Sequence, residues 1–205
     1  MSIIANTYFN SDINLTSTQI TNVVDSWLDI YEEMILKKLL GYDLWVLYDA
    51  DLNKDGAIDE PVAQRFKDLV DGKAFTFEYG GATISTKWQG LRDTTLLKSL
   101  IGYYVYFNYR NEEETFNSSA GQKIGLTENS NNVSAVPKLI NTWNKMVEWY
   151  GQIPTELVYP ELFLDNSNYI HRNSYPSAYN FLLANIDTYP EWVFEPLDRL
   201  NIFGI

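Results

Sequence analysis

The sequence predicts a mainly α protein: a small helical bundle with a β-hairpin insertion, an extended loop and an extended C-terminal arm. Three observations predict this fold class. Apolar residues recur every three or four positions in several segments, apolar and polar residues alternate in one short segment, and two further stretches have no sustained period. A chain of 205 residues can bury roughly 70% of its unfolded surface, so we expect a single domain over residues 1–205.

The first long helix is expected from Thr18 to Leu40, because apolar residues lie there at helical spacing with acidic residues between them. Gly41 can adopt the positive φ that stops a helix. A second helix is expected to begin at Asp59 or Glu60, with the proline that follows in its first turn, and to end at Gly72.

A β-hairpin is expected over residues 74–88. Phe75, Phe77 and Tyr79 alternate with polar residues, which is typical of a strand with one apolar face. Gly80-Gly81 then supplies a turn that tolerates positive φ, and residues 82–87 return as the second strand.

Two further helices are expected on either side of a polar stretch. One is capped by Asp93 or Thr94 and carries an apolar stripe that reaches toward Arg110. The other begins near Pro137 and ends before Gly151. The helical core then comprises residues 18–111 and 136–151.

The remaining segments lack a helical or strand period. Residues 112–135 are rich in Ser, Asn, Gly and Glu, and we expect a mobile loop there. Residues 152–205 are expected to be irregular, with an extended path at their Tyr-Pro and Glu-Pro steps. The apolar load from Trp192 to Ile205 must pack somewhere, and we expect this tail to act as a contact arm on a neighbouring subunit. Packing on its own subunit is the alternative, and the sequence leaves the two nearly balanced.

Composition excludes several classes of site. The chain has no cysteine, which excludes disulfides, thiolate zinc sites, iron–sulfur clusters and a cysteine nucleophile. Its single histidine, His171, lies in a polar stretch without a nucleophile or acid at a telling spacing. The net charge of −12 disfavours a protein that wraps DNA by neutralising phosphates. No segment has the length and apolarity of a membrane span or a signal peptide, so we expect a soluble protein.

One motif matches the first nine positions of an EF-hand-type calcium loop. Gly56 would make its sharp turn, and Ile58 would pack inward. The bidentate acid that closes such a loop is missing, because that position is Val62. The other interpretation is an Asx-rich turn between two helices. The oxygen ligands of a calcium site would be Asp51, Asn53, Asp55, Ala57 (through its carbonyl) and Asp59.

Catalysis has little support in the sequence, and we expect no enzyme and no resident cofactor. Asp49 with Asp51, or Glu112 to Glu114, could form a metal-dependent hydrolytic pair, but solvated acidic faces are the simpler interpretation in so acidic a chain. Gly-rich phosphate loops are also absent, since Gly80-Gly81 belongs to the expected hairpin.

Five segments, in order along the chain, carry a family resemblance. They are Ile-Leu-Lys-Lys-Leu-Leu-Gly-Tyr-Asp-Leu (35–44), Trp-Gln-Gly-Leu-Arg (88–92) with the Tyr-rich run 103–109, Thr-Glu-Asn-Ser-Asn-Asn-Val-Ser (127–134), Lys-Leu-Ile-Asn-Thr-Trp-Asn-Lys (138–145) and the terminal Asn-Ile-Phe-Gly-Ile. In this order the chain resembles the head-to-tail connector (adaptor or ring) proteins of tailed bacteriophages, in particular those of Bacteroidetes and crAss-like phages.

The resemblance implies a structural role in a virion. It implies a portal-associated ring of twelve copies at the head–tail junction, made in the host cytoplasm, that contacts the portal protein and tail or other connector proteins. DNA would pass through the lumen without specific binding, which a negatively charged wall permits. No membrane is involved in such a role, and no functional residue carries over. The alternative classes are a calcium-dependent binding module and a metal-dependent hydrolase.

Overall fold

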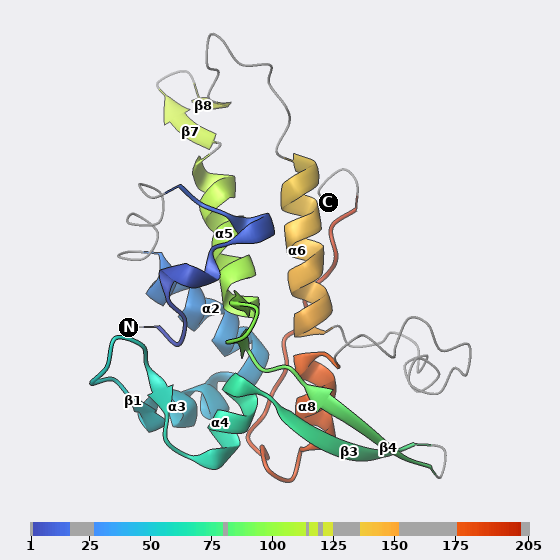
Figure 1. The fold of residues 1–205 in the computed structure, drawn as a ribbon. Helices are drawn as coiled ribbons and strands as arrows, with labels where there is room; N and C mark the ends of the chain where they lie inside the picture. The colour runs from blue at the N-terminus through green and yellow to red at the C-terminus, as the bar shows by residue number, and fades with distance from the viewer. Residues whose placement is uncertain are drawn as a thin grey trace.

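A computed structural model describes the protein over seven ranges (Figure 1): residues 2–16, 27–79, 82–113, 115–118, 121–124, 136–151 and 176–201. Within them the protein is mainly α, as the sequence predicts. The helices are α2 (Leu28–Leu40), α3 (Tyr42–Asp51), α4 (Gln64–Asp71), α5 (Leu100–Glu113), α6 (Val136–Tyr150) and α8 (Ala178–Ala184), with short 3-10 helices η1 (Asn6–Tyr8) and η2 (Ser11–Ile13).

The strands described form four antiparallel pairs. These are β1 (Leu52–Asn53) with β2 (Glu60–Pro61), β3 (Lys73–Tyr79) with β4 (Ala82–Trp88), β5 (Arg92–Asp93) with β6 (Lys98–Ser99), and β7 (Thr115–Ser118) with β8 (Gly121–Ile124). The longest pair occupies the segment where the sequence predicts a hairpin, in a register that joins Phe75 to Thr86 and Lys73 to Trp88.

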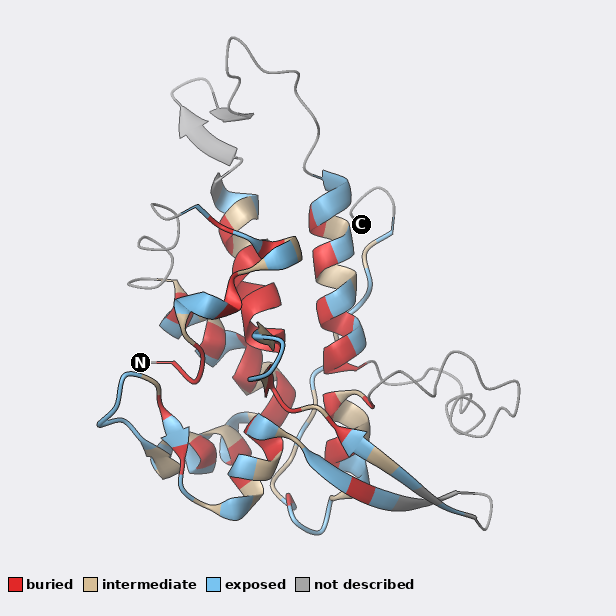
Figure 2. Ribbon diagram, in the orientation of Figure 1, coloured by how far each residue is buried: buried red, intermediate tan, exposed pale blue. Residues whose placement is uncertain are grey.

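Helix α5 is the centre of the core. It contacts both α2 and α6, and Figure 2 shows most of its length as buried. Its buried side chains point in all directions around the helix, which is typical of a helix enclosed by the rest of the fold. They are Leu100, Ile101, Tyr103, Tyr104, Val105, Tyr106 and Tyr109.

An extended segment at the N-terminus completes this core, although the sequence predicts no element there. Ile4 and Ile13 pack beside Gly102 of α5, where their Cδ1 atoms would lie 3.7 and 3.5 Å from an added Cβ. The apolar residues of this segment are all buried: Ile3, Ile4, Tyr8, Phe9, Ile13 and Leu15.

The predicted first helix is confirmed at its C-terminal end. Helix α2 ends at Leu40, and Gly41 has a φ of 75°. The predicted start at Thr18 lies outside the described residues. The prediction misses α3, which begins at Tyr42 directly after Gly41, and a Cβ at Gly41 would lie 2.8 Å from Val193.

Two predicted helix starts are wrong by several residues. Helix α4 begins at Gln64 because Pro61 lies in strand β2, paired with Leu52. Helix α5 begins at Leu100 because Asp93 accepts hydrogen bonds from the amides of Thr95 and Leu96, both at 2.8 Å, and forms a local turn. The predicted ends of α4 at Gly72 and of α6 at Gly151 are confirmed.

The expected loop 112–135 contains regular structure in the part that is described. Helix α5 continues to Glu113, and the polar residues of β7 and β8 pair across residues 115–124. Residues 125–135 lie outside the described ranges, as does the whole stretch 152–175 in the expected irregular region. Within that C-terminal region the structure adds α8, whose first turn is capped by the Ser177 hydroxyl, which accepts from the Asn180 amide at 3.3 Å.

The C-terminal segment is extended, as expected, but the interpretation as an arm that leaves its subunit is wrong for residues 192–201. The amides of Val193 and Glu195 donate to carbonyls at the end of α2. The Trp143 indole of α6 donates to the Asp198 carbonyl at 2.7 Å. Figure 1 shows this segment running beside α6. It therefore packs on its own subunit; residues 202–205 are not described.

Candidate functional site

The predicted calcium loop lies between α3 and α4, and its first acid has a structural role. Asp51 ends α3, and its Oδ2 atom accepts hydrogen bonds from the amides of Val62 and Ala63, both at 2.8 Å. Both amides lie immediately before α4, which begins at Gln64. Asp51 therefore links the end of α3 to the segment that leads into α4.

The other predicted ligands do not gather around Asp51. Asn53 accepts a hydrogen bond from the Asp55 amide at 3.2 Å, and both residues are exposed, as is Ala57. Asp59 is only 1% exposed, and its amide donates to the Ser2 carbonyl at 3.0 Å. Among the described residues, no three His, Cys, Asp or Glu side chains form a group that could hold a metal ion. The β1–β2 pairing across the loop explains this arrangement, because it replaces the entry to a second helix with a strand.

Two of the acids considered for a hydrolytic pair have other partners. Asp49 forms an exposed ion pair with Lys54 at 2.7 Å. Glu112 accepts a hydrogen bond from the Tyr31 hydroxyl at 3.3 Å. Glu114 and His171 lie outside the described residues. No arrangement of two carboxylates around a common point emerges from these positions.

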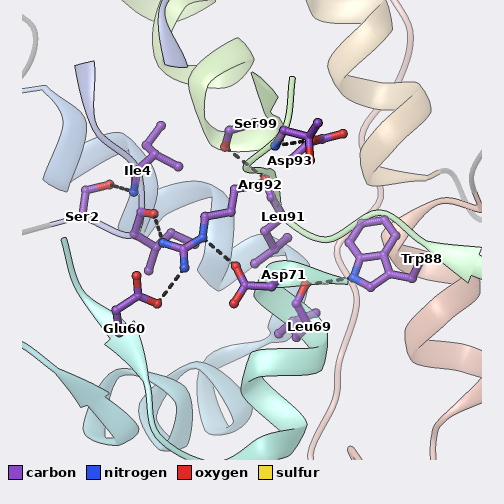
Figure 3. Close-up of polar contacts among 12 residues, drawn as sticks. Ser2, Ile4, Glu60, Leu69, Asp71, Trp88, Leu91, Arg92, Asp93 and Ser99 are labelled. Carbon is purple, nitrogen blue, oxygen red and sulfur yellow. Dashed lines mark hydrogen bonds and ion pairs between the residues drawn. The ribbon is translucent and has the colours of Figure 1, made fainter. Parts of the chain in front are cut away.

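The most connected polar side chain is Arg92 in β5 (Figure 3). Its Nε donates to Asp71 at 2.8 Å, its Nη2 to Glu60 at 2.6 Å and its Nη1 to the Ile3 carbonyl at 2.6 Å. Burial alone would lower the pKa of Arg92, but the hydrogen bonds that Arg92 donates to Asp71 and Glu60 outweigh it and raise that pKa. Arg92 thus joins the N-terminal segment, β2, α4 and β5.

A second buried polar cluster centres on Glu32 of α2. Its carboxylate accepts hydrogen bonds from the Ser2 hydroxyl and, at 3.2 Å, from the Ile3 amide. Burial raises the pKa of Glu32 to about 7, and these two hydrogen bonds oppose that rise. The nearby Tyr48 hydroxyl is buried without a hydrogen-bond partner among the described residues, and burial raises its pKa well above the usual value.

The positions of these two clusters indicate that they stabilise the fold rather than contact a substrate. Glu32 is 6% exposed and Arg92 is 5% exposed, and the polar atoms of both side chains form hydrogen bonds within the chain. The sequence analysis missed both residues. For Glu32, the sequence signal of burial was a charged residue within an apolar helical stripe. For Arg92 there was no such signal in the sequence.

The exposed feature that the fold positions most firmly is the strand pair β3–β4. At its base, Phe181 of α8 stacks on Trp88 with ring centroids 5.7 Å apart and contacts Phe75 edge-on at 5.4 Å. The Trp88 indole also donates to the Leu69 carbonyl at 2.8 Å. Beyond this base the pair extends away from the helices, as Figure 1 shows, with exposed positions at Thr76 and Ser85.

Two glycines allow the base of this strand pair to lie in close contact with the end of α4. Gly72 and Gly90 have φ values of 86° and 94°. A Cβ on Gly72 would lie 2.4 Å from the Trp88 carbonyl oxygen, and one on Gly90 would lie 2.4 Å from that of Val70. Two backbone segments therefore cross in direct contact, which only glycine permits.

A shallow hollow lies beside η1 and η2. It is bordered by two residues with unusual positive φ, Ser11 at 52° and Leu97 at 51°. The Asn10 side chain donates to the carbonyls of Thr7 and Leu97 at 2.8 and 2.7 Å, and so joins η1 to Leu97. Leu96, next to Leu97 at the edge of the hollow, is exposed. The lining residues are Asn6, Thr7, Phe9, Asn10, Ser11, Leu96 and Leu97.

Comparisons of the chain with protein-family models, with curated proteins and with solved structures found no match. In the part of the chain that is described, no helix is both long and apolar enough to span a bilayer.

Proposed function

We propose that this protein is a non-enzymatic structural component of a phage virion: a head-to-tail connector subunit that forms a ring between portal and tail and lines the DNA channel. The order of segments that resembles connector proteins supports the proposal. In this proposal the subunit is a small helical bundle with a β-hairpin insertion, the ring has twelve copies, and the lumen passes DNA without binding it specifically.

The observation that carries the proposal is the anchored strand pair β3–β4. Its base is fixed by Phe181 and by the crossing at Gly72 and Gly90, while its distal half extends beyond the helices. A projecting element on a rigid base can reach a neighbouring subunit without first being ordered, which lowers the entropic cost of association. Ring subunits need such a heterologous contact, since one surface must meet a different surface of the next copy.

Charge is consistent with the same role. A net charge of −12 repels the phosphate backbone, so a ring of these subunits would let DNA move through its lumen. The calcium-dependent binding module has no comparable support, because Asp51 already accepts two backbone hydrogen bonds and the other motif residues lie apart from it.

Assembly with the portal protein encoded by the same genome tests the proposal. The wild-type chain is expected to form rings on the portal that are visible by electron microscopy. A variant in which residues 77–84 are replaced by Asn-Gly keeps the anchored base, and we expect it to melt like the wild type but to form no rings. The matched control, Thr76→Ala with Ser85→Ala, keeps the length of the strand pair and should assemble.

Two results would argue against the proposal. Ring formation by the shortened variant would show that the strand pair is not the contact. A wild-type chain that never associates with the portal, or that is encoded away from portal, capsid and tail genes, would contradict the connector role itself.

A further inference from the structure

The N-terminal segment is held on the fold as a strap. We use this name for residues 2–15, whose apolar side chains are buried against the core. Four polar contacts secure its first residues. They are Ser2 hydroxyl to Glu32, Ile3 amide to Glu32, Arg92 to the Ile3 carbonyl, and the Asp59 amide to the Ser2 carbonyl.

Glu32 is the one acid in this arrangement whose carboxylate is both buried and bonded to the strap. It receives the Ser2 hydroxyl, and that hydroxyl oxygen in turn accepts from the Ile4 amide at 3.1 Å. A buried carboxylate in this position carries a desolvation cost whenever it is ionised. Docking of the strap and ionisation of Glu32 therefore oppose each other.

The charged groups that face Glu32 reinforce this opposition. Asp29 on α2 and Asp59 before β2 both raise its pKa through their negative charge. Tyr48 on α3 is neutral at physiological pH, because burial raises its pKa. Arg92 on β5 carries a buried positive charge, but it is bonded to Asp71 and Glu60.

The negative charge of Asp59 is balanced by nearby cations. Burial raises the pKa of Asp59, while the positive charges of the chain's amino terminus and of Lys54 lower it. Asp59 therefore has cations to balance its charge, whereas among the residues that the structure describes Glu32 accepts hydrogen bonds from Ser2 and Ile3.

We propose that Glu32 is a proton-controlled latch for the N-terminal strap, which is docked when the Glu32 carboxyl is protonated and loosens when it ionises. This inference goes beyond the connector role and does not depend on it. When the strap lifts, Ile3, Ile4 and Phe9 become exposed together with the surface of α5 beneath them, so the latch controls access to an apolar surface.

The direction of the pH dependence follows from the difference in the pKa of Glu32 between the docked and the lifted strap. In the docked state burial raises the pKa of Glu32 to about 7, whereas a glutamate side chain in water has a pKa of about 4.5. Because the docked value is the higher one, docking is strongest below pH 4.5 and weakens as the pH rises toward 7. The opening equilibrium should increase roughly 30-fold between pH 5.5 and 8, and level off above that.

Hydrogen exchange on the full-length chain tests the latch. Protection factors, which correct for the intrinsic pH dependence of exchange, would be measured for the strap and for the Asp59 amide between pH 5.5 and 8.5. In the wild type they should fall roughly 30-fold across this range, while those of α6 stay constant. Glu32→Gln should keep the strap protected at every pH. Glu33→Gln, next to it on α2 but exposed and paired with Lys37, should behave like the wild type.

A second variant keeps the test decisive if Glu32→Gln does not fold. Ser2→Ala removes a hydrogen bond that lowers the pKa of Glu32, so the midpoint of the pH dependence should move to higher pH. Strap protection that does not change with pH in the wild type would overturn the proposal. So would a pH dependence that persists in Glu32→Gln, or a midpoint that Ser2→Ala leaves in place.

Discussion

Arg92 illustrates how a single side chain organises this fold. Its guanidinium donates to acceptors from three separate segments, and each bond is 2.8 Å or shorter. Hydrogen bonds from a charged donor are stronger than neutral ones, and the rigid fork of arginine fixes the relative position of its partners. The Ile3 carbonyl depends on Arg92 most, since it belongs to a fully buried residue.

Replacing Arg92 with methionine should lower the free energy of unfolding by roughly 2–3 kcal/mol, because the Ile3 carbonyl loses its partner and two carboxylates lose their cation. The half-exposed Asp71 and Glu60 can rehydrate, which limits the loss. Urea denaturation followed by tryptophan fluorescence measures it. Arg199→Met removes an exposed pair with Glu148 and should cost less than about 1 kcal/mol. Equal losses in the two variants would contradict the structural role of Arg92.

The sequence alone could not reveal these residues. Arg92 lies 89 positions from its Ile3 partner, and Ser2 lies 30 positions from Glu32. Local periodicity carries no information about such contacts. In the sequence Glu32 is one of several acids on the first helix, and only the packing of the strap distinguishes it from its exposed neighbour Glu33.

At the level of elements, prediction succeeded where an apolar stripe is regular and failed where local hydrogen bonds compete with the helix. Helix α6 has a clear stripe and was predicted closely. Helix α3 was missed because its apolar residues surround the helix, so Tyr42 and Val46 are exposed while Leu44 is buried. Helix α8 has only seven residues, too few to establish a period.

The predicted calcium loop is a second case in which the local sequence pattern did not determine the structure. Its Asx-rich sequence was consistent with either a metal site or a turn, and the choice depended on where Asp51 points. In the structure Asp51 binds the backbone just before α4, a role that sequence spacing did not indicate because it involves amides eleven and twelve positions away.

Replacing Asp51 with alanine should therefore lower the free energy of unfolding by about 1 kcal/mol, the usual net contribution of a hydrogen bond to stability. The loss should be the same in EDTA and in calcium, as judged by urea denaturation. Asp55→Ala changes an exposed acid of the same motif and should have an effect within about 0.5 kcal/mol. If both variants lost stability only when calcium was present, the carboxylates would be metal ligands instead.

The anchor of β3–β4 is the element on which the proposed function depends. Phe181→Ala should lower the free energy of unfolding by about 3–5 kcal/mol, because it removes a fully buried ring that contacts both Phe75 and Trp88. Leu183→Ala changes an exposed residue of the same helix and should cost less than about 1 kcal/mol. Thermal melting of both variants provides the comparison, and similar melting temperatures would mean that α8 does not support the strand pair.

At the scale of the whole molecule, the extended C-terminal segment joins the two helices that flank α5. The backbone of Val193 and Glu195 pairs with the end of α2. On the other side, the Tyr150 hydroxyl of α6 donates to the Glu195 carbonyl at 2.5 Å, and Asn144 exchanges two hydrogen bonds of 2.9 Å with Leu200. The last residues described therefore contribute to the same core as the first.

The aromatic side chains of this segment are partly buried and pack against the core. The Trp192 indole donates to the Leu39 carbonyl at 2.8 Å. Phe194 packs between Tyr150 and Tyr179, with ring centroids 5.0 and 4.8 Å away. Loss of a buried Phe or Trp side chain usually costs about 3–5 kcal/mol, and a typical protein has only about 5–15 kcal/mol of stability.

A chain that ends at residue 191 should therefore unfold or aggregate without any partner present, because it loses Trp192 and Phe194 together with the backbone bonds to α2. Circular dichroism and sedimentation of the truncated chain measure this. A chain that ends at Asn201 keeps every contact described above and should melt close to the wild type, which makes it the matched control. If the chain ending at residue 191 instead stayed folded and in solution, and failed only to join a portal assembly, the segment would be an intersubunit arm. Its packing along α2 and α6 would then not be what stabilises the subunit.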